Sequence, residues 1–206
     1  MLKEIANYLN QNVQGCEAKA VDEVEVGDGH VWVKAESIYD VCVALAQENP
    51  FDFNVLQVIS GVDYPEKDKI EINYMLASFT RNTDFILKTD LPRGDGKALP
   101  KIQSVCDVWM AANYQERECF DMLGVEFEGH PDHRRILCPD DWEGHPLRKD
   151  YVVQKKYRDM VVDPPEKVNS HDHYFYKELL TKHDQKSVSH SWKGEKESKD
   201  QTSAES

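Results

Sequence analysis

The chain has 206 residues, 40% of them hydrophobic, and a formal net charge of −13. This is enough apolar material for one ordinary domain with an extension. So acidic a chain does not suit nucleic acid or an anionic membrane surface as its main partner, because both attract basic proteins. Five cysteines without a Cys-x-x-Cys pair argue against a disulfide framework and against an iron–sulfur cluster bound by this chain alone.

No apolar run reaches membrane-spanning length, and the first residues resemble neither a secretion signal nor a transit sequence. We therefore expect a cytoplasmic protein that associates with a membrane only through a partner.

Residues 1–124 predict an α+β domain. In chain order, the patterns predict a helix over 2–9, a hairpin over 18–33, a helix from 38, strands over 55–64, 70–76 and 84–88, a loop over 94–100, and a helix from 104 to 123. Short connections between successive strands favour antiparallel pairing. The order α-β-β-α-β-β-β-α predicts a two-layer fold with a mostly antiparallel sheet and its helices on one face.

The last predicted helix ends abruptly. Gly124 can adopt the left-handed conformation that closes a helix. His130-Pro131, Cys138-Pro139 and His145-Pro146 then keep the following residues out of the helical region. We call residues 125–165 the strap and expect it to be extended and irregular.

The strap is too apolar for a solvated linker. Its apolar and aromatic residues are Phe127, Ile136, Leu137, Trp142, Leu147, Tyr151 and Tyr157. A long irregular segment is unusual inside a self-contained fold, so we expect the strap to lie on another protein. Beyond it, we expect a short helical stretch over 166–185 and a disordered, polar tail over 186–206.

Glu116 stands on the apolar stripe of the last predicted helix, whose other members are Val105, Trp109, Ala112, Phe120 and Leu123. A buried carboxylate needs a partner. Arg134 or Arg135 could fold back onto Glu116 and pin the strap to the helix. The alternative is a helix break near Asn113 that leaves Glu116 in water.

Several groups could carry chemistry. His130, His133, Cys138 and His145 are zinc-ligand types, but their spacing resembles no common zinc motif. Cys119 lies near a helix C-terminus, which raises the pKa of a thiol and makes it a poor nucleophile. The basic cluster of Arg134, Arg135, Arg148 and Lys149 suits an acidic partner surface, or internal pairing with Glu116, Asp132 or Asp141.

The stretch 116–151 resembles a known family. Glu116-Arg117-Glu118, Asp121-Met122-Leu123, His130 and Arg134-Arg135-Ile136-Leu137 resemble the signature of the 30 kDa subunit of respiratory complex I, which is the C subunit of the bacterial NADH-quinone oxidoreductase. The run from Gly144 to Tyr151 extends the match.

The resemblance implies a non-catalytic scaffold subunit of a proton-translocating NADH:quinone oxidoreductase. It implies a place in the peripheral arm at the cytoplasmic face of a bacterial inner membrane. The implied partners are the complex I subunits D, B and I, with the strap docked on the first of them. FMN, iron–sulfur clusters and quinone would belong to partner subunits, and this chain would bind no cofactor or metal and hold no active site. The residues implied to hold this interface are Glu116, Arg117, Glu118, Asp121, His130, Arg134, Arg135, His145, Arg148, Lys149 and Asp150.

Two alternatives stay open. The first is the equivalent subunit of a membrane-bound hydrogenase-type complex. The second is a free-standing metal-dependent hydrolase built on the histidines and carboxylates of the strap, although the sequence offers it no nucleophile.

Overall fold

The structure, a computed structural model, describes residues 1–22, 28–47, 50–94 and 98–162. It contains two compact units, Met1–Gln154 and Lys155–Ser206. The described part of the second unit is the two-stranded hairpin β8 (Lys156–Tyr157) and β9 (Met160–Val161). The stretches predicted as helical over 166–185 and disordered over 186–206 lie outside the described residues.

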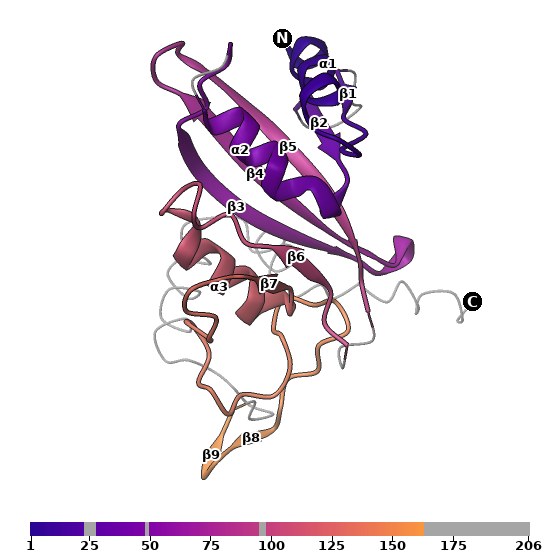
Figure 1. Ribbon diagram of the computed structural model, residues 1–206. Coiled ribbons are helices and arrows are strands. Elements are labelled where there is room, and N and C mark those ends of the chain that lie inside the picture. Colours follow the sequence, from indigo (N-terminus) through magenta and orange to yellow (C-terminus); the bar gives the residue numbers. More distant parts are fainter. Residues whose placement is uncertain (23–27, 48–49, 95–97, 163–206) are drawn as a thin grey trace, which may run out of the picture. The chain divides into compact units, whose positions relative to one another are not determined.

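The first unit is built on a five-stranded sheet (Figure 1). Its strand order is β1-β2-β5-β4-β3, and only the β2–β5 pair is parallel. The prediction of an α+β fold with a mostly antiparallel sheet is therefore confirmed. The strands are β1 (Lys19–Val21), β2 (His30–Val33), β3 (Val55–Tyr64), β4 (Lys69–Ser78) and β5 (Thr83–Pro92).

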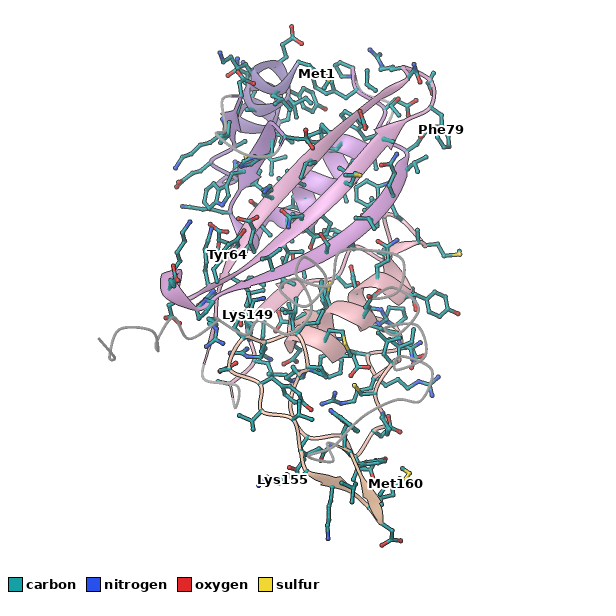
Figure 2. The ribbon with its side chains drawn as sticks, turned by 180° about the vertical axis from the view of Figure 1, so that it is seen from behind. Met1, Tyr64, Phe79, Lys149, Lys155 and Met160 are labelled. Atoms are coloured by element: carbon teal, nitrogen blue, oxygen red, sulfur yellow. The ribbon has the colours of Figure 1, made fainter. Side chains whose placement is uncertain are left out.

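Alternation along β4 shows why this face of the sheet is buried. Ile70, Ile72, Tyr74 and Leu76 point into the core, whereas the residues between them are partly exposed. Helices α1 (Leu2–Asn12) and α2 (Ile38–Ala46) contribute buried residues to the same core. Figure 2 shows the sheet from the opposite side, with α2 behind the strands.

Helix α3 (Ala112–Leu123) packs along the outer edge of β3. Gln115 accepts the amide hydrogen of Ile59 and donates to the carbonyl of Gln57, at the β-bulge in that strand. One turn on, the Cys119 thiol lies against the carbonyl of Ile59. These contacts satisfy backbone groups that an uncovered edge strand would expose to other chains.

Helix α3 ends as expected but begins later than expected. Gly124 closes it at φ 73° in the left-handed conformation. The helix predicted from residue 104 starts only at Ala112, and turns replace it over 104–111. A small parallel sheet of β6 (Lys101–Gln103) and β7 (Glu126–Glu128) flanks this region, and the three-residue η1 (Ala35–Ser37) and η2 (Pro65–Lys67) complete the unit.

Candidate functional site

Asp121, on the last turn of α3, fixes the course of the strap. One carboxylate oxygen accepts a bond from Arg135 Nη1 at 2.7 Å. The other accepts three consecutive backbone amides, from Ile136 at 3.1 Å and from Leu137 and Cys138 at 2.7 Å each. Burial alone would raise the pKa of Asp121, but the amide bonds and Arg135 outweigh it and the pKa is lowered. The carboxylate therefore stays ionised at the point where the strap turns.

Arg117 holds the same part of the strap from one helical turn earlier. Its guanidinium donates to the carbonyl oxygens of Arg134 at 3.1 Å and Arg135 at 3.2 Å, and it lies 3.3 Å from the Asp132 carboxylate. Residues 117 and 121 share one face of α3. Arg117 and Asp121, which carry opposite charges on that face, thus bind successive residues of the strap.

His145 packs against the end of α3. Its Nδ1 lies 3.0 Å from the carbonyl oxygen of Asp121, which can only accept, so Nδ1 carries a proton. A Cβ at Gly124 would come within 2.6 Å of the His145 ring. Only glycine allows the ring to lie so close to this backbone, so the helix cap and the strap are matched to each other.

A second anchor fastens residues 148–150 to the sheet. The buried carboxylate of Asp63, on β3, binds Arg93 at 2.6 and 3.0 Å and accepts the amide of Lys149 at 2.7 Å. Arg93 also reaches Asp150 at 2.7 Å. The bond from Arg93 lowers the pKa of Asp63, so this anchor also carries an ionised acid.

Arg148 completes the second anchor. Its guanidinium donates to the carbonyl oxygens of Arg93 and Gly94, both at 3.2 Å. Three successive residues of the strap therefore bind segments that lie 54 to 86 positions earlier in the chain.

Glu116 is completely buried, yet it pairs with neither Arg134 nor Arg135. It accepts the Ser104 hydroxyl at 2.6 Å, the Val105 amide at 2.7 Å and the Cys106 thiol at 3.3 Å. The pairing of Glu116 with Arg134 or Arg135 is therefore wrong. The alternative is right that the helix is broken close to Asn113, because α3 begins at Ala112, but wrong that Glu116 lies in water, because the turn before α3 surrounds the carboxylate with donors. Arg135 binds Asp121 instead, and Arg134 is exposed beside Asp132. Burial raises the pKa of Glu116 despite these donors.

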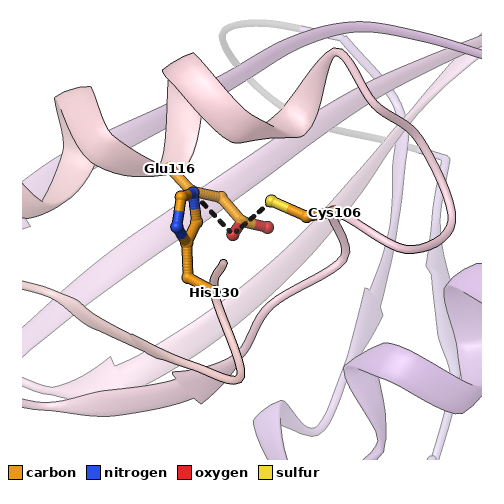
Figure 3. A group of neighbouring side chains, drawn as sticks. All are labelled: Cys106, Glu116 and His130. Carbon is orange, nitrogen blue, oxygen red and sulfur yellow. Dashed lines mark hydrogen bonds and ion pairs between the residues drawn. The ribbon is translucent and has the colours of Figure 1, made fainter. Parts of the chain in front are cut away.

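Cys106, Glu116 and His130 are the three residues whose possible metal-ligand atoms gather within 4.8 Å of one another in the described part of the chain (Figure 3). The Asp132 amide donates to His130 Nδ1 at 3.0 Å, so the neutral ring carries its proton on Nε2, which faces the Asn113 carbonyl oxygen at 3.0 Å. A metal on Nε2 would move that proton onto Nδ1, against the Asp132 amide. The hydrogen bonds thus fit a network without an ion better than a metal site.

The four residues of the zinc alternative do not form a common ligand group among the described residues. The ring nitrogen Nε2 of His133 accepts the Phe127 amide at 3.0 Å, and that of His145 is turned toward Gly124. The expected direction for Cys119 is confirmed, since its pKa is raised to about 12. The main cause is burial and not the helix end.

The strap turns its apolar side chains outward. Leu137 is 62% exposed and Leu147 is 57% exposed, and Val152 and Val153 are exposed as well. Phe127, by contrast, is buried in the core, and the Trp142 indole donates to the Tyr151 hydroxyl at 3.1 Å. Polar groups of the strap therefore bind its own domain, while several of its large apolar groups face away from it.

Of the eleven residues that the sequence singled out, eight make side-chain contacts within the domain, in three separate groups. Glu116 lies beside His130, whereas Arg148 and Asp150 belong to the second anchor, and the end of α3 holds Arg117, Asp121, Arg135 and His145. Glu118 and Arg134 are exposed, and Lys149 takes part through its backbone. Asp63 and Arg93 were missed. The signal for Asp63 was available, because it follows Ile59 and Gly61 on the inward-facing positions of β3.

The described residues contain no helix that is both long and apolar enough to cross a membrane. Residues 31–157 match the family model described as respiratory-chain NADH dehydrogenase, 30 Kd subunit.

Curated relatives are named as the C subunit of NADH-quinone oxidoreductase. The protein from Moorella thermoacetica is 43% identical over 122 residues, which cover 59% of this chain and 78% of that one. The protein from Acidothermus cellulolyticus is 38% identical over 154 residues, 71% of this chain and 78% of the relative. Among solved structures, a chain of the membrane-bound sulfane sulfur reductase, an archaeal respiratory membrane complex, aligns with a TM-score of 0.60 and 28% identity. The alignment covers 81% of this chain and 97% of the other.

Proposed function

The chain belongs to the family of the respiratory-chain NADH dehydrogenase 30 kDa subunit, and from this premise we propose that it is a scaffold subunit of complex I that docks its strap on the D subunit. The partners of a protein in this family are the other subunits of a respiratory complex. Subunits B and I are proposed as further neighbours. FMN, the iron–sulfur clusters, quinone and the proton-translocating machinery are assigned to partner subunits, and membrane association at the cytoplasmic face is assigned to the complex.

One observation carries the docking proposal: the strap binds its own domain through polar groups and turns large apolar side chains away from it. A segment that only packs on its own domain would do the opposite. Asp121 and Asp63 hold it by charge and backbone hydrogen bonds, whereas Leu137 and Leu147 point away from the domain. Exposed apolar side chains on a rigidly held segment are typical of a protein interface. A fixed scaffold also suits electron transfer, because small misplacements of reacting groups are costly.

The test is to replace Leu137 and Leu147 together with Asp in the full chain. Both side chains are exposed, so the midpoint of thermal unfolding of the isolated chain should barely change. After gentle solubilisation of membranes, a native gel stained for NADH dehydrogenase activity should show strong loss of the large active band. Phe79→Asp is the matched control, because Phe79 is 78% exposed on the turn between β4 and β5, away from the strap. Normal assembly of the double variant would refute docking through the strap.

The structural likeness to the sulfane sulfur reductase chain favours a second candidate, the corresponding subunit of a respiratory membrane complex other than an NADH dehydrogenase. The same native gel distinguishes the two candidate complexes. A large band that contains this chain but lacks NADH activity would support the second candidate, and a large NADH-active band would support complex I.

A further inference from the structure

We infer that the free edge of β6 is a docking site for an extended segment of another subunit, which would add to the β6–β7 sheet as a third strand. This inference concerns the edge of β6, which precedes α3, and not the exposed apolar residues of the strap, although β7 and the groove residue Glu128 belong to the strap. It requires only that the chain works inside a multi-subunit complex, as the proposed function states.

The first observation is the pairing pattern of β6. In the parallel ladder, the amide and carbonyl of Ile102 bond to β7, as do the neighbouring carbonyl of Pro100 and amide of Ser104. The amides and carbonyls of Lys101 and Gln103 point to the other edge. Among the described residues, none of these four groups has a hydrogen-bond partner.

The second observation is that side chains cover backbone groups on two other strand edges in this unit. Gln115 satisfies an amide and a carbonyl on the outer edge of β3. His133 accepts the outward amide of Phe127 on β7. The edge of β6 lacks such a cover among the described residues, so it keeps the backbone groups that strand addition needs.

The third observation is a groove of about 600 Å³ beside this edge. It lies between β6, the end of β5 and the start of η1. Its apolar lining comes from Trp32, Ala35, Leu91, Pro92 and Ile102. An added strand would place alternate side chains over this lining, because successive residues of a strand point to opposite faces.

The charged side chains that line the groove limit the kind of segment that can bind there. The cations on the groove wall are already engaged: Lys34 with Glu17, and Lys101 with Glu126 and Glu128. Glu36 is exposed and forms no ion pair among the described contacts, although its charge acts on nearby Lys34. The groove therefore suits an extended segment with apolar side chains at alternate positions and a lysine or arginine near Glu36. A second copy of this chain fits poorly, because each copy carries a net charge of −13.

The test compares hydrogen exchange of single backbone amides in the purified full chain and in the complex isolated from membranes. The amides of Lys101 and Gln103 should exchange on the order of tenfold more slowly, or slower still, in the complex. The amide of Ile102 is the internal control, because β7 already protects it in the free chain. Equal exchange of Lys101 and Gln103 in both samples would overturn the inference. Protection that appears in the free chain with rising concentration would assign the edge to a second copy and overturn it as well.

Gln103→Pro provides the independent variant. Proline removes the outward amide of residue 103 without touching the bonds that Ile102 makes to β7. We expect a severalfold loss of assembled complex, whereas Gln103→Ala, which keeps the amide, should assemble normally. A folded Gln103→Pro chain that assembles like the wild type would refute the site. If this variant does not fold, the hydrogen exchange of Lys101 and Gln103 in the wild-type chain tests the site by itself. A chain that never enters a large complex would refute both the proposed function and this site, whereas a complex with an unprotected β6 edge would refute only the site.

Discussion

The Asp121 carboxylate lies 2.7 Å from Arg135 Nη1, and this pair joins the end of α3 to the strap. The same carboxylate collects three consecutive amides of the strap. The Asp121 side chain thus pairs with a guanidinium and holds a backbone turn at the same time. The junction should therefore be sensitive to small chemical changes at residue 121.

Asp121→Asn should lower the free energy of unfolding by roughly 2–4 kcal/mol. The substitution removes the charge that faces half-buried Arg135, and the asparagine NH2 group then meets either Arg135 or the strap amides, all of which donate. Urea denaturation measures the loss, and limited proteolysis should cut the strap faster. Arg134→Ala is the control, because its pair with Asp132 is exposed to water and should contribute little to stability. Equal effects of the two substitutions would contradict the role assigned to Asp121.

Gly124→Ala should destabilise the protein far more than Gly129→Ala. Both glycines have positive φ, so both substitutions incur the cost of the left-handed conformation, about 1 kcal/mol. A Cβ at residue 124 would also meet the His145 ring at 2.6 Å, whereas one at residue 129 meets nothing within 4 Å. Overpacking adds about 1–3 kcal/mol. Similar thermal midpoints for the two variants would show that His145 moves aside freely.

The end of α3 was predictable from sequence and its beginning was not. Gly124 marks the end because few other residues accept its backbone conformation. The apolar spacing of Val105 and Trp109 continued the helical pattern, and both are buried, but the chain around them forms turns. Ser104, Val105 and Cys106 donate hydrogen bonds to Glu116 there. The turn that these tertiary hydrogen bonds require overrides the helical periodicity of the local sequence.

The sequence also did not show which charged side chains pair with one another. The pattern showed that Glu116 faces inward and that arginines follow, yet hydroxyl, amide and thiol donors satisfy Glu116 while Arg135 goes to Asp121. Asp63 and Arg93 lie 30 positions apart and bind Lys149 and Asp150 from the far end of the unit. Such contacts depend on how β3 and β5 pair with β4, which lies between them, and the spacing of residues along the chain does not show this.

Glu116→Ala should cost roughly 2–4 kcal/mol, because it leaves the Ser104 hydroxyl and the Val105 amide buried without an acceptor. Glu116→Gln keeps an acceptor and should cost much less. Neither variant should speed cleavage of the strap near Arg135 as Asp121→Asn does. Faster cleavage there in Glu116→Gln would revive a direct link between Glu116 and the strap.

The same Glu116→Gln variant should change the pH dependence of stability. The pKa of Glu116 is raised in the folded chain, so the folded state binds a proton that the unfolded state has released. This contribution is fully present below the unfolded pKa of about 4.5 and is lost as the pH rises through the folded value. Urea midpoints measured from pH 4 to pH 7 should therefore fall less steeply, or rise more steeply, in Glu116→Gln than in the wild type.

Acid should loosen the strap through His133 and His145. Burial is the largest cause that lowers the pKa of each ring below 6.5. The stability that their neutral forms contribute is fully present above 6.5 and is lost as the pH falls through the folded pKa. Each group can contribute a slope of at most about 1.4 kcal/mol per pH unit. Proteolysis of the strap should therefore accelerate below pH 6.5.

His145→Asn isolates one of these groups, because asparagine can still donate to the Asp121 carbonyl but does not titrate. We expect this variant to lose less stability than the wild type between pH 7 and pH 5, as measured by urea unfolding at each pH. His30→Asn, on β2 and away from the strap, is the matched control and should leave the cleavage of the strap at each pH as it is in the wild type. An unchanged slope in His145→Asn would mean that His145 does not link acid to the strap. Since Gly124 lies directly under this ring, release of His145 by acid should also free the end of α3.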